Sequence, residues 1–281
     1  MNNEEDHKEQ LRQESLKIRE NLKKIKHRIV VFSGKGGVGK TTVSINLAYA
    51  IQNLGKATGL LDADITGPNI SKMTGIQAYT DPSDSHRIPR QKNFVKIVSF
   101  GSMIGEGEPV IWRGPLRSKM LNSFLADIEW GDLDYLIADM PPGTGDEIIT
   151  MGQKMMPDLA VIVTTPQEVS LVDSHRAINM ARKMNIPRIA LVENMSGFLC
   201  PECGAKIDLF GSGGGKRQAE SMYLNYLGSL PVDINARKWA DEGRPFILED
   251  PESEISGSML KIAEKTCKLV EEDSIHEEIG A

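Results

Sequence analysis

Cysteine and long apolar runs are scarce in this sequence, and it has no excess of basic residues. Three of its 281 residues are cysteine, so they cannot all pair with one another, and a disulfide-stabilised secreted domain is excluded. No apolar run reaches the roughly 18 residues that cross a bilayer. The opening residues MNNEEDHKEQ contain no apolar signal segment. We therefore expect a soluble cytoplasmic protein with no membrane partner.

The charge balance is acidic, because 39 Asp and Glu outnumber 33 Lys and Arg and leave a formal net charge of -6. A protein that coats nucleic acid needs a basic surface, so we expect no nucleic-acid partner. With 40% hydrophobic residues, the composition is that of an ordinary globular chain. Its 26 glycines exceed the roughly 20 that average usage gives for this length.

The body of the chain alternates between strand-like and helix-like segments. Six short, mostly apolar runs predict strands buried on both faces, at residues 28–33, 57–62, 95–100, 134–139, 159–164 and 188–193. Helical patterns lie at residues 40–54, 115–128, 146–155 and 168–184. This alternation predicts an α/β fold, with a mainly parallel sheet and helices on both faces.

The chain divides into three parts. Residues 1–26 are densely charged, with apolar residues at helical spacing, which predicts either a solvated helix with a narrow apolar stripe or a disordered arm that docks elsewhere. Residues 27–250 form the α/β domain, with an exposed excursion at residues 76–93 and an insertion at residues 198–215. Residues 251–281 contain an amphipathic helix, predicted at residues 252–279, with an acidic end.

The strongest motif lies between the first predicted strand and the first predicted helix. It reads GKGGVGKT from Gly34 to Thr41 and fits G-x-x-x-x-G-K-[ST], whose glycines let backbone N–H groups turn toward phosphate oxygens. In this chemistry Lys40 reaches the β- and γ-phosphates, and Thr41 supplies a hydroxyl to Mg²⁺. The residues of this stretch that we expect to bind nucleotide are Gly34, Lys35, Gly36, Gly37, Val38, Gly39, Lys40, Thr41 and Thr42.

The loop carries a second lysine, Lys35, at its second position. Lys35 is either a surface charge that points to solvent or a charge held for the transition state of phosphoryl transfer, as arginine fingers are. Its place early in the loop allows it to face outward, toward another subunit.

Acidic side chains follow two predicted strands, at the sheet edge where ligands of open α/β sheets gather. Asp62 and Asp64 end the second strand, and Asp139 ends the fourth. Carboxylates there can hold Mg²⁺ or orient an attacking water, and for Asp62 a strand-end cap or a salt bridge is the alternative.

After the sixth strand, the side chain of Asn194 can both donate hydrogen bonds to adenine and accept them from it. The adjacent carboxylate of Glu193 leaves guanine open as the base.

Cys200 and Cys203 stand in the sequence CPECG, which is typical of a metal-binding knuckle. A redox C-x-x-C usually opens a helix in a thioredoxin-like unit, and that context is missing here, while a disulfide is disfavoured in a reducing cytosol. Zinc and the common iron–sulfur clusters take four protein ligands, and a two-fold dimer would supply four thiolates. Cys267, in a helical pattern, is expected to be a buried small hydrophobic residue.

Four motifs together resemble the Mrp/ApbC family of P-loop iron–sulfur cluster carriers, over roughly residues 27–250. They are the loop KGGVGKT, the run DMPPGTGD at residues 139–146, the run PVIWRGP at residues 109–115 and the run NMSGFLCPECG at residues 194–204. The loop resembles the deviant Walker A motif of the SIMIBI class of NTPases. The resemblance implies a P-loop NTPase fold in a nucleotide-sandwich homodimer, in which Lys35 reaches the partner's phosphates.

The resemblance also implies individual roles. Asp64 matches the switch I aspartate that positions water, and Asp139 matches the Walker B aspartate in the second shell of the Mg²⁺ site. Asn194 matches the adenine-contacting asparagine, which favours ATP. The residues that match switch II are Gly143, Thr144, Gly145 and Asp146. The catalytic residues are then Lys35, Lys40 and Asp64.

The function that the resemblance implies is an ATPase that receives a [4Fe–4S] cluster from donors and delivers it to apo iron–sulfur proteins. Cys200 and Cys203 of both subunits would hold the cluster. The residues themselves leave [2Fe–2S] open, and a structural zinc in the same dimer is a further alternative. A MinD/ParA-like positioning ATPase is another, but it needs a basic surface or a basic amphipathic end, and this tail is acidic.

Overall fold

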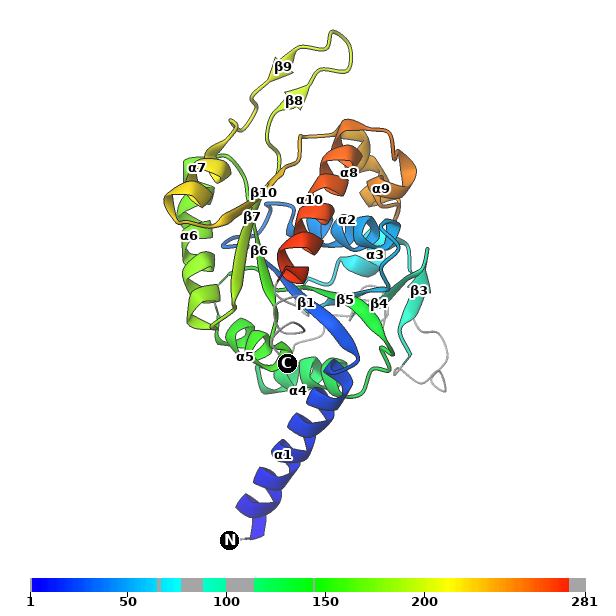
Figure 1. The fold of residues 1–281 in the computed structure, drawn as a ribbon, viewed down its shortest axis with the longest axis vertical. Helices are drawn as coiled ribbons and strands as arrows, with labels where there is room; N and C mark the ends of the chain where they lie inside the picture. The colour runs from blue at the N-terminus through cyan, green and yellow to red at the C-terminus, as the bar shows by residue number, and fades with distance from the viewer. Residues whose placement is uncertain (1, 65–66, 77–87, 100–113, 144, 273–281) are drawn as a thin grey trace.

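A computed structural model describes residues 2–64, 67–76, 88–99, 114–143 and 145–272. The strands of this part form one eight-stranded sheet with the order β10-β7-β6-β1-β5-β2-β4-β3, and a separate two-stranded hairpin (Figure 1). The six predicted strands are all present and pair in parallel. They are β1 (Ile25–Phe32), β2 (Thr58–Asp62), β4 (Val95–Ser99), β5 (Leu133–Asp139), β6 (Leu159–Thr164) and β7 (Arg188–Glu193).

Two further strands extend the sheet at its edges. β10 (Asn225–Ser229) pairs in parallel with β7, and β3 (Arg90–Lys92) pairs antiparallel with β4. Within the predicted excursion at residues 76–93, residues 90–92 form this edge strand and remain partly exposed. Residues 77–87 of that excursion lie outside the described residues.

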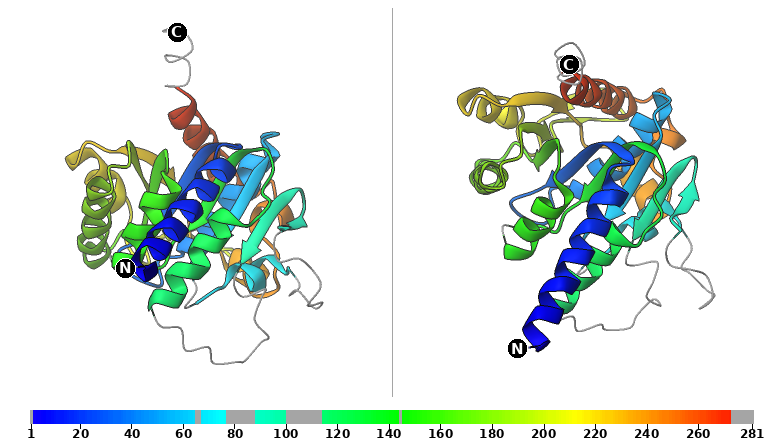
Figure 2. Two further views of the ribbon diagram at one scale, coloured as in Figure 1. Left: turned by 90° about the horizontal axis from the view of Figure 1, so that it is seen from below. Right: turned by 60° about the horizontal axis from the view of Figure 1, so that its bottom comes forward.

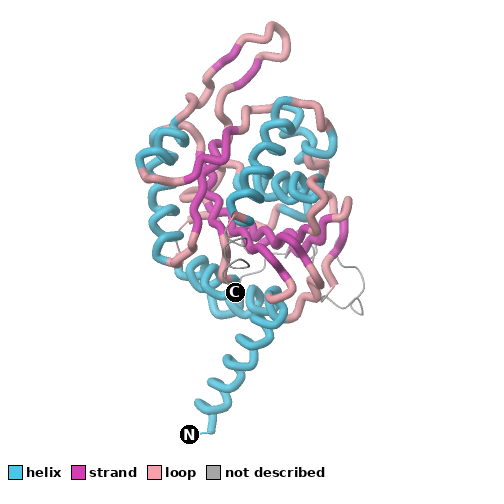
Figure 3. The backbone as a smooth tube through the Cα atoms, viewed as in Figure 1, coloured by secondary structure: helices cyan, strands magenta, loops and turns pink. Residues whose placement is uncertain are grey.

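Helices cover both faces of the sheet, as predicted (Figures 2 and 3). One face carries α4 (Gly114–Ala126), α5 (Asp146–Met155), α6 (Glu168–Lys183), α7 (Gly214–Ser221) and the C-terminal end of α1 (Asn2–Leu22). The other carries α2 (Lys40–Asn53), α3 (Ile70–Thr74), α8 (Ile234–Asp241), α9 (Phe246–Glu249) and α10 (Glu254–Glu271). No helix among the described residues is both long and apolar enough to span a membrane.

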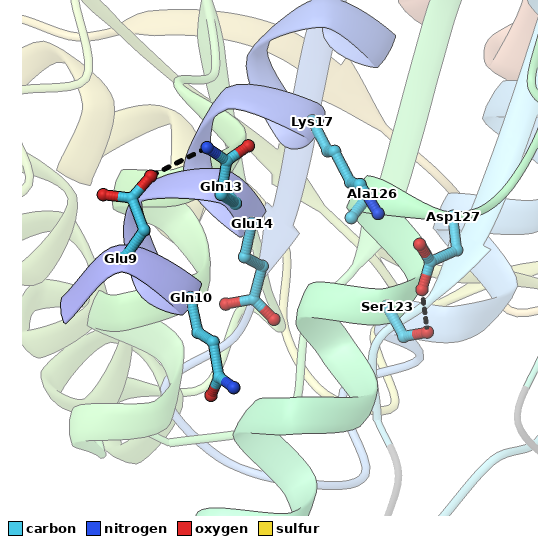
Figure 4. Close-up of a pocket in the computed structure, with 8 residues that line it drawn as sticks. All are labelled: Glu9, Gln10, Gln13, Glu14, Lys17, Ser123, Ala126 and Asp127. Carbon is cyan, nitrogen blue, oxygen red and sulfur yellow. Dashed lines mark hydrogen bonds between the residues drawn. The ribbon is translucent and has the colours of Figure 1, made fainter. Parts of the chain in front are cut away.

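The N-terminal segment is a helix, which matches the first of the two predicted alternatives. Ile18 and Leu22 are buried against the core. The side-chain amide of Asn21 donates to the carbonyl oxygens of Leu125 (2.9 Å), in the last turn of α4, and of Ile128 (2.6 Å), just after α4. The opposite end of α1 projects away from the fold (Figure 1). Between α1 and the end of α4 lies a groove of about 560 Å³, lined mostly by residues of polar type (Figure 4).

The C-terminal helix α10 begins after Ser253, whose hydroxyl accepts a hydrogen bond from the backbone N–H of Ser256. Its apolar side packs against α2 and β10. The predicted helix at residues 252–279 is thus present from Glu254 to Glu271, and its acidic end at residues 273–281 lies outside the described residues.

Candidate nucleotide site and cysteine hairpin

The phosphate loop connects β1 to α2. Gly37 and Gly39 have φ values of 82° and 79°, in the left-handed region that side chains rarely adopt. A Cβ atom on Gly36 or Gly37 would meet no heavy atom within 4 Å, so the space beside these two glycines is open. The loop therefore offers space beside the N-terminus of α2, where anions are favoured. Lys35 is half-buried at the start of the loop, and Thr42 is half-buried in the first turn of α2.

Asp139, at the end of β5, collects three donors from α2. The Nζ atom of Lys40 lies 2.8 Å from its Oδ1 atom. The hydroxyl of Thr41 donates to Oδ2 at 2.7 Å, and the hydroxyl of Ser44 donates to Oδ1 at 2.6 Å. The ammonium group of Lys40 is therefore within ion-pair distance of Asp139. Among the described residues, however, it has no partner with hydrogen-bond geometry. A buried cation with unused donors beside an open loop fits a phosphate ligand.

Ser44 is a residue of this site that the sequence analysis missed. It lies three residues after Thr41, on the same side of α2, and it is fully buried. Helical spacing from Thr41 was the signal that could have identified it.

Asp62 stands directly beside Asp139, because β2 and β5 pair in parallel with these two residues in register. Its Oδ2 atom accepts hydrogen bonds from the hydroxyl of Ser99 (2.8 Å) and the backbone N–H of Ile70 (3.3 Å). Burial, followed by the negative charge of Asp139, raises the pKa of Asp62 to about 7. Asp62 therefore makes the contacts of a strand-end cap, which was the alternative prediction, and it lies within the candidate site.

Asp64 lies two residues beyond the end of β2 and is half-buried. Its backbone N–H donates to the Oδ1 atom of Asp62 at 3.2 Å, and its own Oδ1 atom accepts from the backbone N–H of Gly67 at 3.1 Å. Asp62 thus fixes the backbone that carries Asp64. The structure brings Asp64, Asp139 and Lys40 to the ends of neighbouring elements, at the carboxyl edge of the sheet.

The stretch that matches switch II lies next to the phosphate loop. The backbone N–H of Gly143 donates to the carbonyl oxygen of Ser33 at 3.1 Å, and Gly143 has a φ of 101°. Gly145 precedes α5, which begins at Asp146. Thr144 lies outside the described residues, as do residues 100–113, which include most of the PVIWRGP run.

Asn194 reaches the phosphate loop from the end of β7. Its side-chain amide donates to the carbonyl oxygen of Val38 at 2.9 Å, and its backbone N–H donates to that of Thr164 at 2.8 Å. A Cβ atom on Gly39 would lie 2.2 Å from the amide nitrogen of Asn194. The side chain is buried and in contact with the loop. The neighbouring Glu193 points elsewhere, to Ser196 and to the start of α7.

Cys200 and Cys203 lie at the tip of a hairpin formed by β8 (Phe198–Leu199) and β9 (Lys206–Ile207), which projects beyond the sheet (Figure 1). The backbone N–H of Cys200 donates to Ala205, and that of Gly204 donates to the carbonyl oxygen of Cys200, both at 2.9 Å. Gly204 has a φ of 69°, which closes the turn. Hydrogen bonds from the backbone of Cys203, then from that of Glu202, lower the pKa of the Cys200 thiol.

The hairpin and the residues that follow it expose apolar side chains. Leu199, Ile207, Leu209 and Phe210 are each more than a third exposed. Cys203 is exposed and Cys200 is half-buried. Over the described ranges, no group of three or more His, Cys, Asp or Glu residues is arranged to hold a metal ion. Cys267 lies in α10 and is buried, as predicted, and burial raises its pKa.

Comparison with known proteins gives consistent matches over most of the chain. Residues 24–267 match the family described as ParA: NUBPL iron-transfer P-loop NTPase. A Methanocaldococcus jannaschii protein named iron-sulfur cluster carrier protein is 48% identical over 272 residues, covering 95% of this chain and 92% of its own. A Pyrococcus horikoshii protein of the same name is 45% identical over 268 residues, covering 91% and 90%.

Solved structures show the same fold. A nucleotide-binding protein of Archaeoglobus fulgidus in complex with ADP superposes with a TM-score of 0.72 and 36% identity, over 85% of this chain and 94% of that chain. The cell division ATPase MinD of Pyrococcus furiosus superposes with a TM-score of 0.65 over 87% and 99%. At 23% identity, the second likeness shows the fold alone.

Proposed function

Because this chain belongs to the ParA-type family of NUBPL iron-transfer P-loop NTPases, we propose that it is a homodimeric, ATP-hydrolysing iron–sulfur cluster carrier. It takes a [4Fe–4S] cluster from donor proteins and transfers it to apo-proteins in the cytoplasm. The observation that carries the proposal is the combination of an open phosphate loop with an exposed pair of thiols in one chain. The loop between β1 and α2 supplies the first feature, and the hairpin at Cys200 and Cys203 supplies the second.

The nucleotide part of the proposal assigns the loop residues to ATP. Lys40 gives up its contact with Asp139 and binds the β- and γ-phosphates, and its buried, unused donors support this role. Thr41 and Asp139 are the groups that would hold Mg²⁺, with Asp139 in the second shell, and the ion would neutralise phosphate charge.

Asp64 orients the attacking water, and Lys35 reaches the phosphates of the partner subunit. Asn194 contacts adenine from its position beside Val38.

The cluster part of the proposal rests on ligand number. Common iron–sulfur clusters take four cysteine thiolates, and each chain presents two at the tip of the hairpin. Two hairpins that face each other across a two-fold axis supply the full set. The exposed apolar residues of the hairpin and the lowered pKa of Cys200 support such a shared site.

Anaerobic reconstitution tests this proposal. The wild-type protein, Cys200→Ser/Cys203→Ser and the control Cys267→Ser are incubated with iron and sulfide, and bound iron and sulfide are measured together with the visible spectrum. We expect a coloured cluster in the wild type and in Cys267→Ser, and none in the double variant. Equal cluster content in the double variant contradicts the assignment. A colourless wild-type protein with bound zinc would support the structural-zinc alternative instead.

A further inference from the structure

Glu193 is a fully buried carboxylate between the phosphate loop and the cysteine hairpin. It is the last residue of β7 and exposes 0% of its surface. Its Oε1 atom accepts hydrogen bonds from the hydroxyl of Ser196 (2.5 Å) and the backbone N–H of Gly213 (2.8 Å), and its Oε2 atom accepts from the backbone N–H of Gly215 (2.5 Å). A buried carboxylate needs such donors, so these bonds fix both the side chain and its partners.

The three partners stand on both sides of the hairpin. Ser196 lies just before β8, whereas Gly213 and Gly215 lie after β9, at the N-terminal end of α7. Backbone hydrogen bonds reinforce the arrangement. The backbone N–H of Leu230 donates to the carbonyl oxygen of Glu193 at 2.8 Å, and the backbone N–H of Ser196 donates to the carbonyl oxygen of Leu230 at 2.9 Å. One carboxylate therefore ties both ends of the cysteine hairpin to the end of one strand.

The glycine run GSGGG at residues 211–215, which nucleotide chemistry leaves unexplained, permits this arrangement. A Cβ atom on Gly215 would lie 2.8 Å from the side chain of Leu191, and one on Gly214 would lie 2.5 Å from the carbonyl oxygen of Pro166. Both distances are too short for a side chain. The glycines thus allow the start of α7 to approach β7 closely enough for Glu193 to bind its backbone.

The residue after Glu193 contacts the phosphate loop. Asn194 donates to the carbonyl oxygen of Val38, and Gly39 is packed against the same amide group. The two neighbouring side chains therefore point to different parts of the molecule, one to the nucleotide site and one to the hairpin. A short, buried segment connects the two sites without a flexible linker.

We propose that Glu193 is a positioning residue that couples nucleotide binding at Asn194 to the geometry of Cys200 and Cys203. This inference rests on the proposed function for its biological meaning, since the coupling would link ATP to cluster transfer. A nucleotide that enters the loop changes the contact between Val38 and Asn194. The end of β7 moves with Asn194, and the carboxylate of Glu193 carries both ends of the hairpin with it.

Thiol reactivity of the cluster-free protein tests the coupling independently of cluster binding. Alkylation rates of Cys200, Cys203 and Cys267 are measured by mass spectrometry, without nucleotide and with saturating MgADP or a non-hydrolysable MgATP analogue. Cys267 is buried and therefore reports global unfolding. The test variant is Glu193→Gln, which keeps the size of the side chain but places an N–H₂ group against backbone N–H donors.

Gln218→Ala is the matched control. Gln218 holds α7 to α6, because it donates to the carbonyl oxygen of Leu171 (2.7 Å) and accepts from the hydroxyl of Ser174 (2.6 Å). The control thus loosens the same helix without touching the hairpin ends. Nucleotide affinity is measured for every variant, so that a lost response can be separated from lost binding.

In the wild type and in Gln218→Ala, we expect nucleotide to change the alkylation rate of Cys200 or Cys203 about fivefold or more, the lower range of allosteric coupling. In Glu193→Gln, the ratio with and without nucleotide falls close to one, while nucleotide affinity and the Cys267 rate stay at wild-type values. A wild-type ratio of one, an unchanged ratio in Glu193→Gln, or equal loss in both variants overturns the inference. Failure of the proposed function shows separately, as missing iron and sulfide after reconstitution.

Discussion

The Nζ atom of Lys40 lies 2.8 Å from the Oδ1 atom of Asp139, and both side chains are buried. The same carboxylate accepts hydrogen bonds from Thr41 and Ser44. The lysine predicted to bind phosphate and the predicted Mg²⁺-site residues are thus already assembled around one charge. Under the proposed function, a nucleotide would replace the carboxylate as the partner of Lys40 and would reorganise few side chains.

The two lysines of the loop are predicted to act at different steps. Lys40→Ala removes charge-assisted contacts to the phosphates and should weaken ATP binding about 10- to 100-fold. Lys35→Ala should leave ATP binding close to the wild-type value and reduce hydrolysis on the order of a thousandfold, as loss of an arginine finger does. Isothermal titration and a phosphate-release assay measure the two effects. Wild-type turnover in Lys35→Ala excludes its role in the partner's site.

The raised pKa of Asp62 predicts a pH-dependent stability in the protein without nucleotide and Mg²⁺. The pKa is about 7 in the folded chain against an ordinary value of 3.8. The folded state therefore binds this proton more tightly than the unfolded state, and the contribution of Asp62 to the unfolding free energy falls as pH rises from about 4 to about 7.

Asp62→Asn removes this titration. Between pH 5 and 8, the wild type should lose about 2 to 3 kcal/mol more unfolding free energy than the variant does, at about 1.4 kcal/mol per pH unit over the interval. Urea denaturation at several pH values measures the difference. Parallel curves for the two proteins contradict the burial effect on Asp62.

Gly39 is predicted to tolerate no side chain. It has a φ of 79° and lies against the amide of Asn194, so Gly39→Ala should cost roughly 1 to 3 kcal/mol of stability through backbone strain and should displace Asn194. Gly36→Ala is the control, since its Cβ atom would meet nothing within 4 Å. Thermal unfolding without nucleotide compares the two, and equal melting temperatures show that the loop can relax around Gly39.

The α1 helix is predicted to contribute to stability through its C-terminal end. Leu22 is 1% exposed, whereas Leu16 in the same helix is 45% exposed. Leu22→Ala should lower the unfolding free energy by about 3 kcal/mol, as buried leucine truncations do, and Leu16→Ala by about 0.5 kcal/mol or less. Chemical denaturation checks both. Similar values for the two variants mean that α1 does not pack on α4 in solution.

The sequence predicted the central strands and the phosphate loop well, because parallel strands buried on both faces form continuous apolar runs. β10 was missed because its residues NYLGS are mixed in polarity and contain a glycine. β8 and β9 have two residues each, too few for a pattern. The contacts of Glu193 could not be predicted, since Gly213 and Gly215 lie about twenty residues away.

Native mass spectrometry of the anaerobically reconstituted protein tests the central claim most directly. We expect a species of two chains with one cluster of four iron and four sulfide ions, absent from Cys200→Ser/Cys203→Ser and present in Cys267→Ser. A single chain that holds the complete cluster, or a clustered dimer of the double variant, contradicts the claim that two subunits share it through Cys200 and Cys203.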